Sequence, residues 1–209
     1  MNRALRALLP VFAVLAFAQE GSAQNPPAGA PAGQRGRGGG GRGRAIQVMT
    51  LTSSGFSDGS TIPTKYSQSG VEVSPPLAWS GVPDSAVVSF ALVVHDLDAA
   101  GNNGDDFLHW LVWNIPAASR SLPEAVPQGP QLSDGARQIS ASGPYYRGPA
   151  APATGPAHHY VFELYALDAT IEVPPVGAAP AATRTAVMTA MAGHVRGKAV
   201  LVGTFKRKS

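Results

Sequence analysis

The sequence predicts a mainly β domain, a β-sandwich with Greek-key connections and one helix near the C-terminus. Short apolar runs rich in β-branched and aromatic residues recur along the chain, and stretches rich in proline and glycine separate them. Only residues 183–192 show alanine and methionine at helical spacing, and Gly193 follows them as a typical helix end. About seven strands and a single late helix are therefore expected.

The N-terminal 44 residues are not expected to belong to this domain. Residues 1–23 begin with two arginines, continue with an apolar run and end in Gly-Ser-Ala, the order of a secretory signal peptide cleaved near Ala23. The apolar run is too short to span a bilayer, and a short buried helix is the alternative. Residues 24–44 are rich in glycine, arginine and proline and predict a disordered linker. We expect a periplasmic or secreted protein whose domain occupies residues 45–209.

The net charge of +3 comes from the leader and the linker. Residues 1–44 carry six arginines and one glutamate, whereas residues 45–209 carry ten basic and twelve acidic residues. The folded part is mildly acidic, which argues against nucleic acid binding by a broad basic face of the domain. The Arg/Gly segment is interpreted as a flexible cationic linker. Contact with an anionic envelope surface and RNA binding are the alternatives for that segment.

The absence of cysteine excludes several chemistries. Without thiols there is no disulfide framework, no thiolate zinc site and no cysteine nucleophile. The 165 residues of the expected domain are enough to bury a core. No second apolar segment is long enough to cross a membrane as a helix.

The strands follow from local patterns of hydrophobicity. Residues 46–51 alternate apolar and polar side chains, whereas residues 87–94 are almost continuously apolar and predict a strand buried on both faces. Prolines at 63, 75 and 76 and the loops after residue 117 interrupt pairing. Five of the expected strands can be located, at residues 46–51, 87–94, 108–115, 158–170 and 200–205.

A polar loop between the two most apolar strands marks the expected site. His95, Asp96 and Asp98 lie at its start, and His109 lies just beyond its end. A titratable cluster held at the end of buried strands is a typical place for a functional site. The remaining pair, Asp105-Asp106, is interpreted as a solvated loop tip, and His95 has no assigned role.

Strand alternation limits which of these side chains can converge. Asp96 and Asp98 are two apart and are expected to point the same way if their strand continues. Of the adjacent His158 and His159, only His158 shares a face with Tyr160. By the same rule, His109 is expected on the face of Leu111 and Trp113.

Motif patterns do not add a metal site or a nucleophile. The Asp-x-Asp lacks the rest of an EF-hand loop, no HExxH pair is present, and no GxSxG elbow accompanies the histidines. The residues alone therefore indicate a polar pocket without a metal or cofactor.

Three segments resemble the phosphatidylethanolamine-binding proteins, and most closely the bacterial Raf kinase inhibitor-like branch of the YbhB/YbcL type. These segments are SPPLAWSGVPDSAVVSFALVVHDLDA, FLHWLVWNIPA and GPAAPATGPAHHYVFELYALD. The resemblance extends over about residues 46–205. It implies a β-sandwich with a small anion pocket near one end, which binds phosphate-like groups and phospholipid head groups.

The resemblance also implies the residues of that pocket: Asp96, Asp98, His109, Gly148, His158 and Tyr160. Two motifs depart from the family pattern. Leu97 and Ala100 replace both prolines of the Asp-Pro-Asp-x-Pro motif, so this loop is expected to be less rigid. Ala150-Ala151 stands where bacterial members often have Cys-Pro.

In such a pocket, two carboxylates beside two imidazoles would hold the rings in fixed tautomers and raise their pKa values. The histidines, Tyr160 and the N–H groups of the Gly148 loop would surround a phosphate. The aspartates would receive the ammonium of a phosphoethanolamine-type head group. Anion affinity is expected to rise as pH falls through about 6.5.

The expected function is non-catalytic binding of a small anionic or phosphorylated ligand. An inhibitor or protein-interaction module, acting on a protease or a signalling protein, is one alternative. A hydrolase that uses His158 or His109 with Asp96 as general acid and base is the other. The sequence also leaves a homodimer open.

Overall fold

The computed structural model describes residues 45–84, 86–99, 106–175 and 179–209. The expected signal peptide, the linker and Asp105 lie outside the described residues. The strands are β1 (Gln47–Val48), β2 (Thr50–Thr52), β3 (Leu77–Ser80), β4 (Ser89–Asp96), β5 (Phe107–Pro116), β6 (Ser121–Leu122), β7 (Arg137–Ile139), β8 (His158–Leu167) and β9 (Val195–Phe205), and the helices are a 3-10 turn (Thr64–Tyr66) and α1 (Pro180–Met191).

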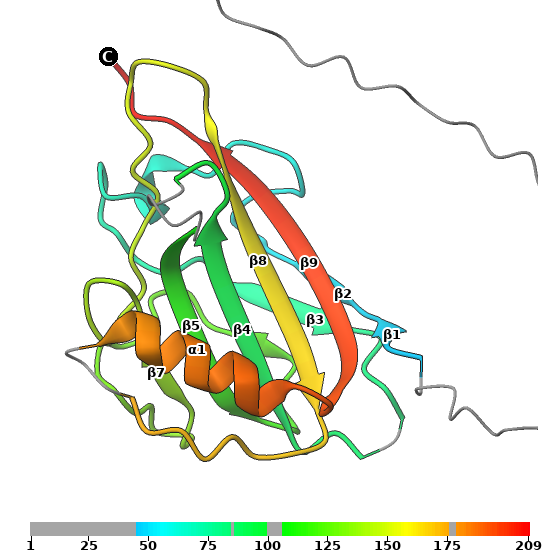
Figure 1. The fold of residues 1–209 in the computed structure, drawn as a ribbon. Helices are drawn as coiled ribbons and strands as arrows, with labels where there is room; N and C mark the ends of the chain where they lie inside the picture. Colours follow the sequence, from blue (N-terminus) through cyan, green and yellow to red (C-terminus); the bar gives the residue numbers. More distant parts are fainter. Residues whose placement is uncertain (1–44, 85, 100–105, 176–178) are drawn as a thin grey trace, which may run out of the picture. The chain divides into compact units, whose positions relative to one another are not determined.

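The strands form two sheets (Figure 1). The larger has the order β1-β9-β8-β4-β5-β7, and the smaller has the order β2-β3-β6. Within the larger sheet β4, β5 and β7 follow one another, and β8 returns to pair with β4 on its other side. This order is a Greek key, so the predicted mainly β fold with Greek-key connections is confirmed.

The larger sheet separates two hydrophobic cores, which explains why β4 is apolar along its whole length. Every residue of β4 is buried. Phe90, Leu92 and Val94 face the smaller sheet, whereas Ala91 and Val93 face α1. Figure 1 shows α1 lying across one face of the sheet and β2 and β3 behind the other. The strand that the sequence predicted to be buried on both faces has that environment.

Several element boundaries differ from those predicted. The first predicted strand is divided at Met49, because the N–H of this buried residue bonds to the carbonyl of Lys198 at 2.8 Å while β2 pairs with the other sheet. The predicted helix begins earlier, at Pro180, whose fixed φ suits a first helical turn. The last strand begins at Val195 rather than residue 200.

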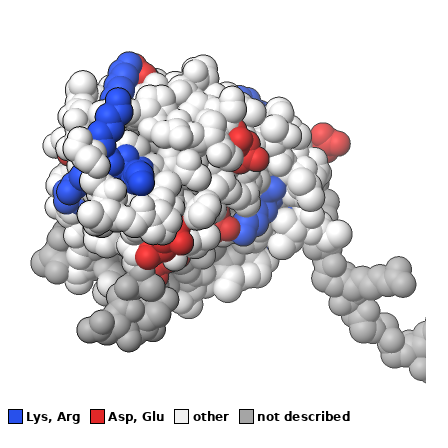
Figure 2. Space-filling model, turned by 90° about the horizontal axis from the view of Figure 1, so that it is seen from above, with Lys and Arg blue, Asp and Glu red and all other residues white. Residues whose placement is uncertain are grey.

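The face shown in Figure 2 carries its Lys and Arg side chains in separate small groups among mostly uncharged residues. Within the described residues, no helix is long and apolar enough to cross a membrane.

Candidate functional site

A cavity of about 260 Å³ lies where β4 ends and β5 and β8 begin. Three of the six residues predicted for the site line it, namely Asp96, His109 and His158. The other lining residues are Gln68, Ala99, Phe107, Arg147, Ala150, Ala151 and Pro152. Asp98, Gly148 and Tyr160 are adjacent in the fold but do not line the cavity.

Asp96 and His158 form the centre of this wall. Asp96 pairs with Tyr160 in the β4–β8 ladder and is only 3% exposed. The Nδ1 atom of His158 lies 2.9 Å from Oδ2 of Asp96. Because a carboxylate only accepts, Nδ1 carries the hydrogen, and Nε2 is the ring nitrogen left for a ligand.

The second oxygen of Asp96 closes the turn after β4. Its Oδ1 accepts the backbone N–H groups of Asp98 at 2.9 Å and Ala99 at 3.2 Å. This arrangement is an Asx-type turn, and it stops the strand at Asp96.

Asp98 lies beyond the end of β4, so the condition for its sharing a direction with Asp96, that the strand continues, is not met. The Oδ2 atom of Asp98 accepts from the backbone N–H of His159 at 2.6 Å and lies 2.9 Å from the Nδ1 of the same residue. These hydrogen bonds, with that of the backbone N–H first, hold the pKa of the Asp98 carboxyl below its ordinary value. The physical reason is that the strand has ended, so alternation no longer applies. His159, which alternation removed from the pocket, is the partner of Asp98.

His109 occupies a β-bulge. The β4–β5 register pairs Val94 with Trp110 and then His95 with Leu108, which leaves His109 as the extra residue. The prediction that His109 shares a face with Leu111 and Trp113 is therefore wrong, since the bulge shifts the alternation. Its ring instead packs edge-on against that of Tyr160, with centroids 5.0 Å apart.

The ring of His109 is fixed by a main-chain acceptor. Its Nδ1 donates to the carbonyl of Arg147 at 2.7 Å, which leaves Nε2 without the hydrogen in the neutral ring. Burial lowers the pKa of His109 below the ordinary value of 6.5. The expectation that the neighbouring carboxylates raise the pKa of this ring is wrong, because desolvation of the charged form outweighs them.

Tyr160 and Gly148 position the loop that forms the far wall. The hydroxyl oxygen of Tyr160 accepts the N–H groups of Ala150 at 3.2 Å and Ala151 at 3.1 Å. The N–H of Gly148 donates to Oε1 of Glu72 at 3.2 Å. These loop donors, which were expected to surround a phosphate, are already engaged within the protein. Burial is the main reason that the pKa of Tyr160 lies above its ordinary value.

Gly148 is required by close packing of the loop. A Cβ at this position would lie 2.6 Å from the carbonyl oxygen of Tyr66 and 2.9 Å from backbone atoms of Ser67. Backbone atoms cannot move aside as a flexible side chain can. The loop therefore approaches the 3-10 turn as closely as it does only because residue 148 is glycine.

Sequence reasoning missed Arg147, Gln68 and Phe107. Arg147 directly precedes the Gly148 loop, and this adjacency was the available signal. Its guanidinium Nη2 donates to Oε1 of Gln68 at 3.0 Å. Gln68 lies about 80 residues earlier in the chain, and no local pattern marks it. Phe107 packs on His109, with ring centroids 5.0 Å apart.

A second cluster lies on the opposite, helix-covered face of β4. His95 contacts Asp106 through Nδ1, and its Nε2 lies 3.6 Å from Oε2 of Glu163. Burial alone would lower the pKa of His95, but the carboxylates of Glu163 and Asp106 outweigh it and the pKa is raised. The nearby His95 ring is the first reason that the pKa of Glu163 falls to about 2. His95, unassigned from sequence, thus links two carboxylates on the helix side.

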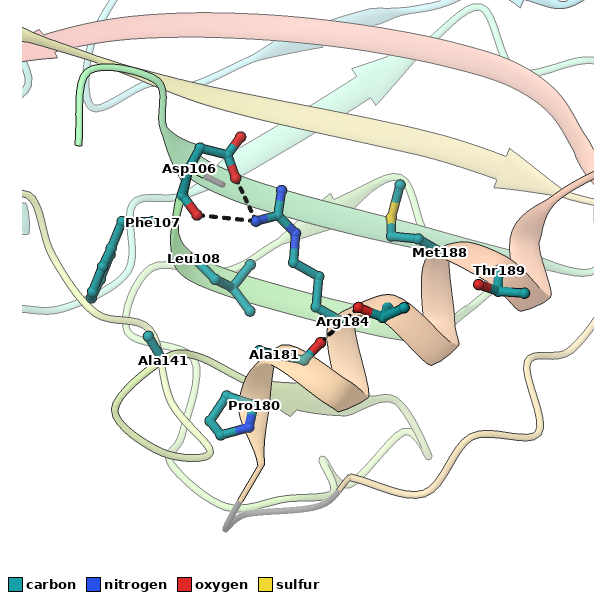
Figure 3. A pocket seen from close by; sticks show the side chains of 10 residues that line it. Asp106, Phe107, Leu108, Ala141, Pro180, Ala181, Arg184, Met188 and Thr189 are labelled. Atoms are coloured by element: carbon teal, nitrogen blue, oxygen red, sulfur yellow. Dashed lines mark hydrogen bonds and ion pairs between the residues drawn. The ribbon is translucent and has the colours of Figure 1, made fainter. Parts of the chain in front are cut away.

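Asp106 is not a solvated loop tip as predicted. Its side chain is 21% exposed and forms an ion pair with Arg184 of α1 (Figure 3). The guanidinium of Arg184 also donates to the backbone carbonyl of Asp106 at 3.2 Å. This cluster borders a larger cavity of about 700 Å³ between α1 and the start of β5. Asp106 is drawn into a tertiary contact because α1, which carries Arg184, packs across the sheet.

Within the described residues, no group of three or more His, Cys, Asp or Glu side chains is arranged to hold a metal ion. The histidines of the small cavity are each engaged at Nδ1 by an oxygen of the protein.

Comparison with known proteins decides the family. The sequence model of the phosphatidylethanolamine-binding protein family matches residues 52–206. The chain belongs to this family. A UPF0098 protein of Methanothermobacter thermautotrophicus is 40% identical over 161 residues, which cover 76% of this chain and 99% of that protein. The family resemblance stated from the sequence is confirmed.

Solved structures of family members share the fold. The homologue CT736 of Chlamydia trachomatis superposes with a TM-score of 0.64 at 32% identity, covering 78% of this chain and 99% of CT736. YbcL of E. coli, described as a member of the mammalian family, gives a TM-score of 0.60 at 25% identity, covering 77% of this chain and 99% of YbcL.

Proposed function

We propose that this protein binds a small anionic or phosphorylated ligand, such as phosphate or a phospholipid head group, in the 260 Å³ cavity without transforming it. The observation that carries the proposal is the His158–Asp96 pair. Asp96 holds Nδ1 of His158 at 2.9 Å, and the ring lines the cavity with Nε2 available. An imidazole oriented in this way donates to an anion when it is protonated. Membership of a family named for a phospholipid supports a phosphate-containing ligand.

Binding is favoured over catalysis by the residues around the cavity. No serine, threonine, lysine or cysteine is among its described lining residues. Asp96, the one carboxylate there, accepts from two backbone N–H groups and from His158. These three hydrogen bonds hold the carboxylate in the position that orients the His158 ring, so its role is positioning of the ring rather than general-base catalysis.

The proposed location is the periplasm or the exterior of the cell. Support comes from the order of charge, apolar run and small residues in residues 1–23. The cationic segment that follows is proposed to act as a linker, with contact to anionic envelope lipids as its alternative role.

Isothermal titration of the purified protein with inorganic phosphate at pH values from 5 to 8 tests the binding proposal. Affinity should rise as pH falls, because an imidazolium at a cavity wall offers an anion one more donor and a positive charge than a neutral imidazole does. Sulfate is a second probe, since its charge does not change over this range whereas that of phosphate does. Flat affinity for both anions from pH 5 to 8 would contradict the proposal.

Two variants make this experiment specific. His158→Ala should lose most of the affinity and its pH dependence. His159→Ala is the matched control, because its ring contacts Asp98 outside the cavity. Equal losses in the two variants would argue against a direct contact between His158 and the anion.

A further inference from the structure

Hydrogen bonds between the backbone of Arg147 and His109 hold this residue at the cavity wall. Its N–H donates to the carbonyl of His109 at 3.0 Å, and its carbonyl accepts from Nδ1 of the same histidine at 2.7 Å. The residues on either side are also fixed. The hydroxyl of Tyr146 donates to the carbonyl of Tyr66 at 3.0 Å, and Gly148 packs against the backbone of Tyr66 and Ser67. The Arg147 side chain therefore projects from a segment of main chain that is fixed by hydrogen bonds and close packing.

The guanidinium of Arg147 is positioned but not neutralised. Within the described residues, its recorded side-chain partner is the amide oxygen of Gln68 at 3.0 Å, and no carboxylate lies within ion-pair distance. Gln68 is itself fixed, because its Nε2 donates to the carbonyl of Gly148 at 2.8 Å and its backbone N–H donates to the carbonyl of Pro149 at 3.0 Å. A partly buried cation with a neutral partner retains donors for an anion.

Among the described residues, the carboxylates near the cavity already accept hydrogen bonds from protein groups. Both oxygens of Asp96 accept protein donors, as described above. Asp98 faces His159 and does not line the cavity. Glu72 accepts the N–H of Gly148 and is also absent from the lining residues. An ammonium placed in this cavity would meet a guanidinium and imidazoles, and the one carboxylate among the described lining residues, Asp96, already accepts three hydrogen bonds from the protein.

We propose that Arg147, oriented by Gln68, is the fixed cation of this cavity and makes it selective for phosphate monoesters without an ammonium group over zwitterionic phosphoethanolamine. This inference rests on the proposed anion-binding function. The planar guanidinium donates two parallel N–H groups to phosphate oxygens, a geometry that favours a terminal phosphate. Burial is the main reason that the pKa of His109 is lowered; the positive charge of Arg147 acts in the same direction, whereas the hydrogen bond to the Arg147 carbonyl opposes it.

The test is calorimetric titration at pH 7.5 with two probes of similar size, methyl phosphate and O-phosphoethanolamine. The wild-type protein should bind methyl phosphate more tightly. Arg147→Gln should weaken methyl phosphate binding by about tenfold or more, the effect typical of a lost charged hydrogen bond, and should remove the preference between the probes. Arg120→Gln is the control for the change in net charge, because this exposed arginine does not line the cavity; its guanidinium donates to the main-chain carbonyls of Ala117 and Ser119 and lies over the ring of Phe90.

The outcomes separate this inference from the proposed function. Methyl phosphate binding that is equal in wild type and Arg147→Gln overturns the role of Arg147 while leaving anion binding intact. Tighter binding of O-phosphoethanolamine by the wild type overturns the selectivity. If the wild type binds neither probe nor inorganic phosphate, the proposed function itself fails. Retained folding of Arg147→Gln, checked by circular dichroism, shows that a loss of binding is not a loss of structure.

Discussion

The Nδ1 atom of His158 lies 2.9 Å from Oδ2 of Asp96, although 62 residues separate them in the chain. The contact joins the first residue of β8 to the last residue of β4. It forms because the β4–β8 ladder places Asp96 opposite Tyr160, two residues beyond His158 on the same face. The sheet register thus sets the orientation of the ring that faces the cavity.

The two aspartates at the end of β4 should differ in their effect on stability. Asp96→Ala removes a 3% exposed acceptor of three hydrogen bonds and should lower the free energy of unfolding by about 2–4 kcal/mol. Asp98→Ala removes an exposed pair with His159 and should cost less than about 1 kcal/mol. Urea denaturation measures both values. Equal losses in free energy of unfolding would show that the difference in burial between the two carboxylates does not affect stability.

Gly148 should be intolerant of alanine. The added Cβ would lie within 3 Å of three backbone atoms of Tyr66 and Ser67, so Gly148→Ala should cost about 3 kcal/mol or more and displace the loop. Gly155→Ala is the control in the same loop, because nothing lies within 4 Å and only its positive φ adds strain of about 1 kcal/mol. Thermal denaturation of the two variants tests this difference. A Gly148→Ala protein as stable as Gly155→Ala would contradict the packing described.

His95 should make stability depend on pH. Because its folded pKa is raised above 6.5, the stabilisation is fully present below pH 6.5 and is lost as pH rises through the folded pKa. The advantage of the wild type over His95→Gln in free energy of unfolding should therefore shrink between pH 6 and pH 8.5. The titration of His109 cancels in this difference, since both proteins contain it.

A second variant tests whether the carboxylates near His95 cause this pH dependence of the free energy of unfolding. Glu163→Gln removes one of the two carboxylates near the His95 ring and should reduce the pH dependence without abolishing it, since Asp106 remains. Denaturation curves at four pH values suffice. A wild-type advantage that is constant or grows with pH would mean that burial, rather than the carboxylates, dominates the environment of His95.

Phosphoester hydrolysis is expected to be absent. The described cavity lining offers no hydroxyl or thiol nucleophile, and Asp96 is already held by three donors. Screening p-nitrophenyl phosphate and bis-p-nitrophenyl phosphate should give rates equal to those without protein. Turnover by the wild type that disappears in His158→Ala would instead support the hydrolase alternative. The inhibitor alternative is tested by measuring the activity of a panel of proteases with and without the protein.

Much of the fold could be predicted from local sequence patterns. The continuous apolar run that becomes β4 indicated a strand buried on both faces, and the alternation in β8 placed His158 with Tyr160 and away from His159. The late helix followed from its spacing and from Gly193, although Pro180 extends it at its start. These features are predictable because alternation and helical spacing depend on neighbouring residues alone.

The tertiary structure alone decided which side chains meet at the cavity. A bulge in the β4–β5 ladder changes the face on which His109 lies, and the turn after Asp96 places Asp98 next to His159. Arg147 and Gln68 meet across 79 residues, and Asp106 and Arg184 across 78. Such contacts depend on register shifts, on where a strand ends and on how distant segments pack, and a sequence pattern read locally does not contain this information. The sequence by itself determined the β fold, the family and part of the candidate site, whereas packing between distant segments decided which charged side chains line the cavity.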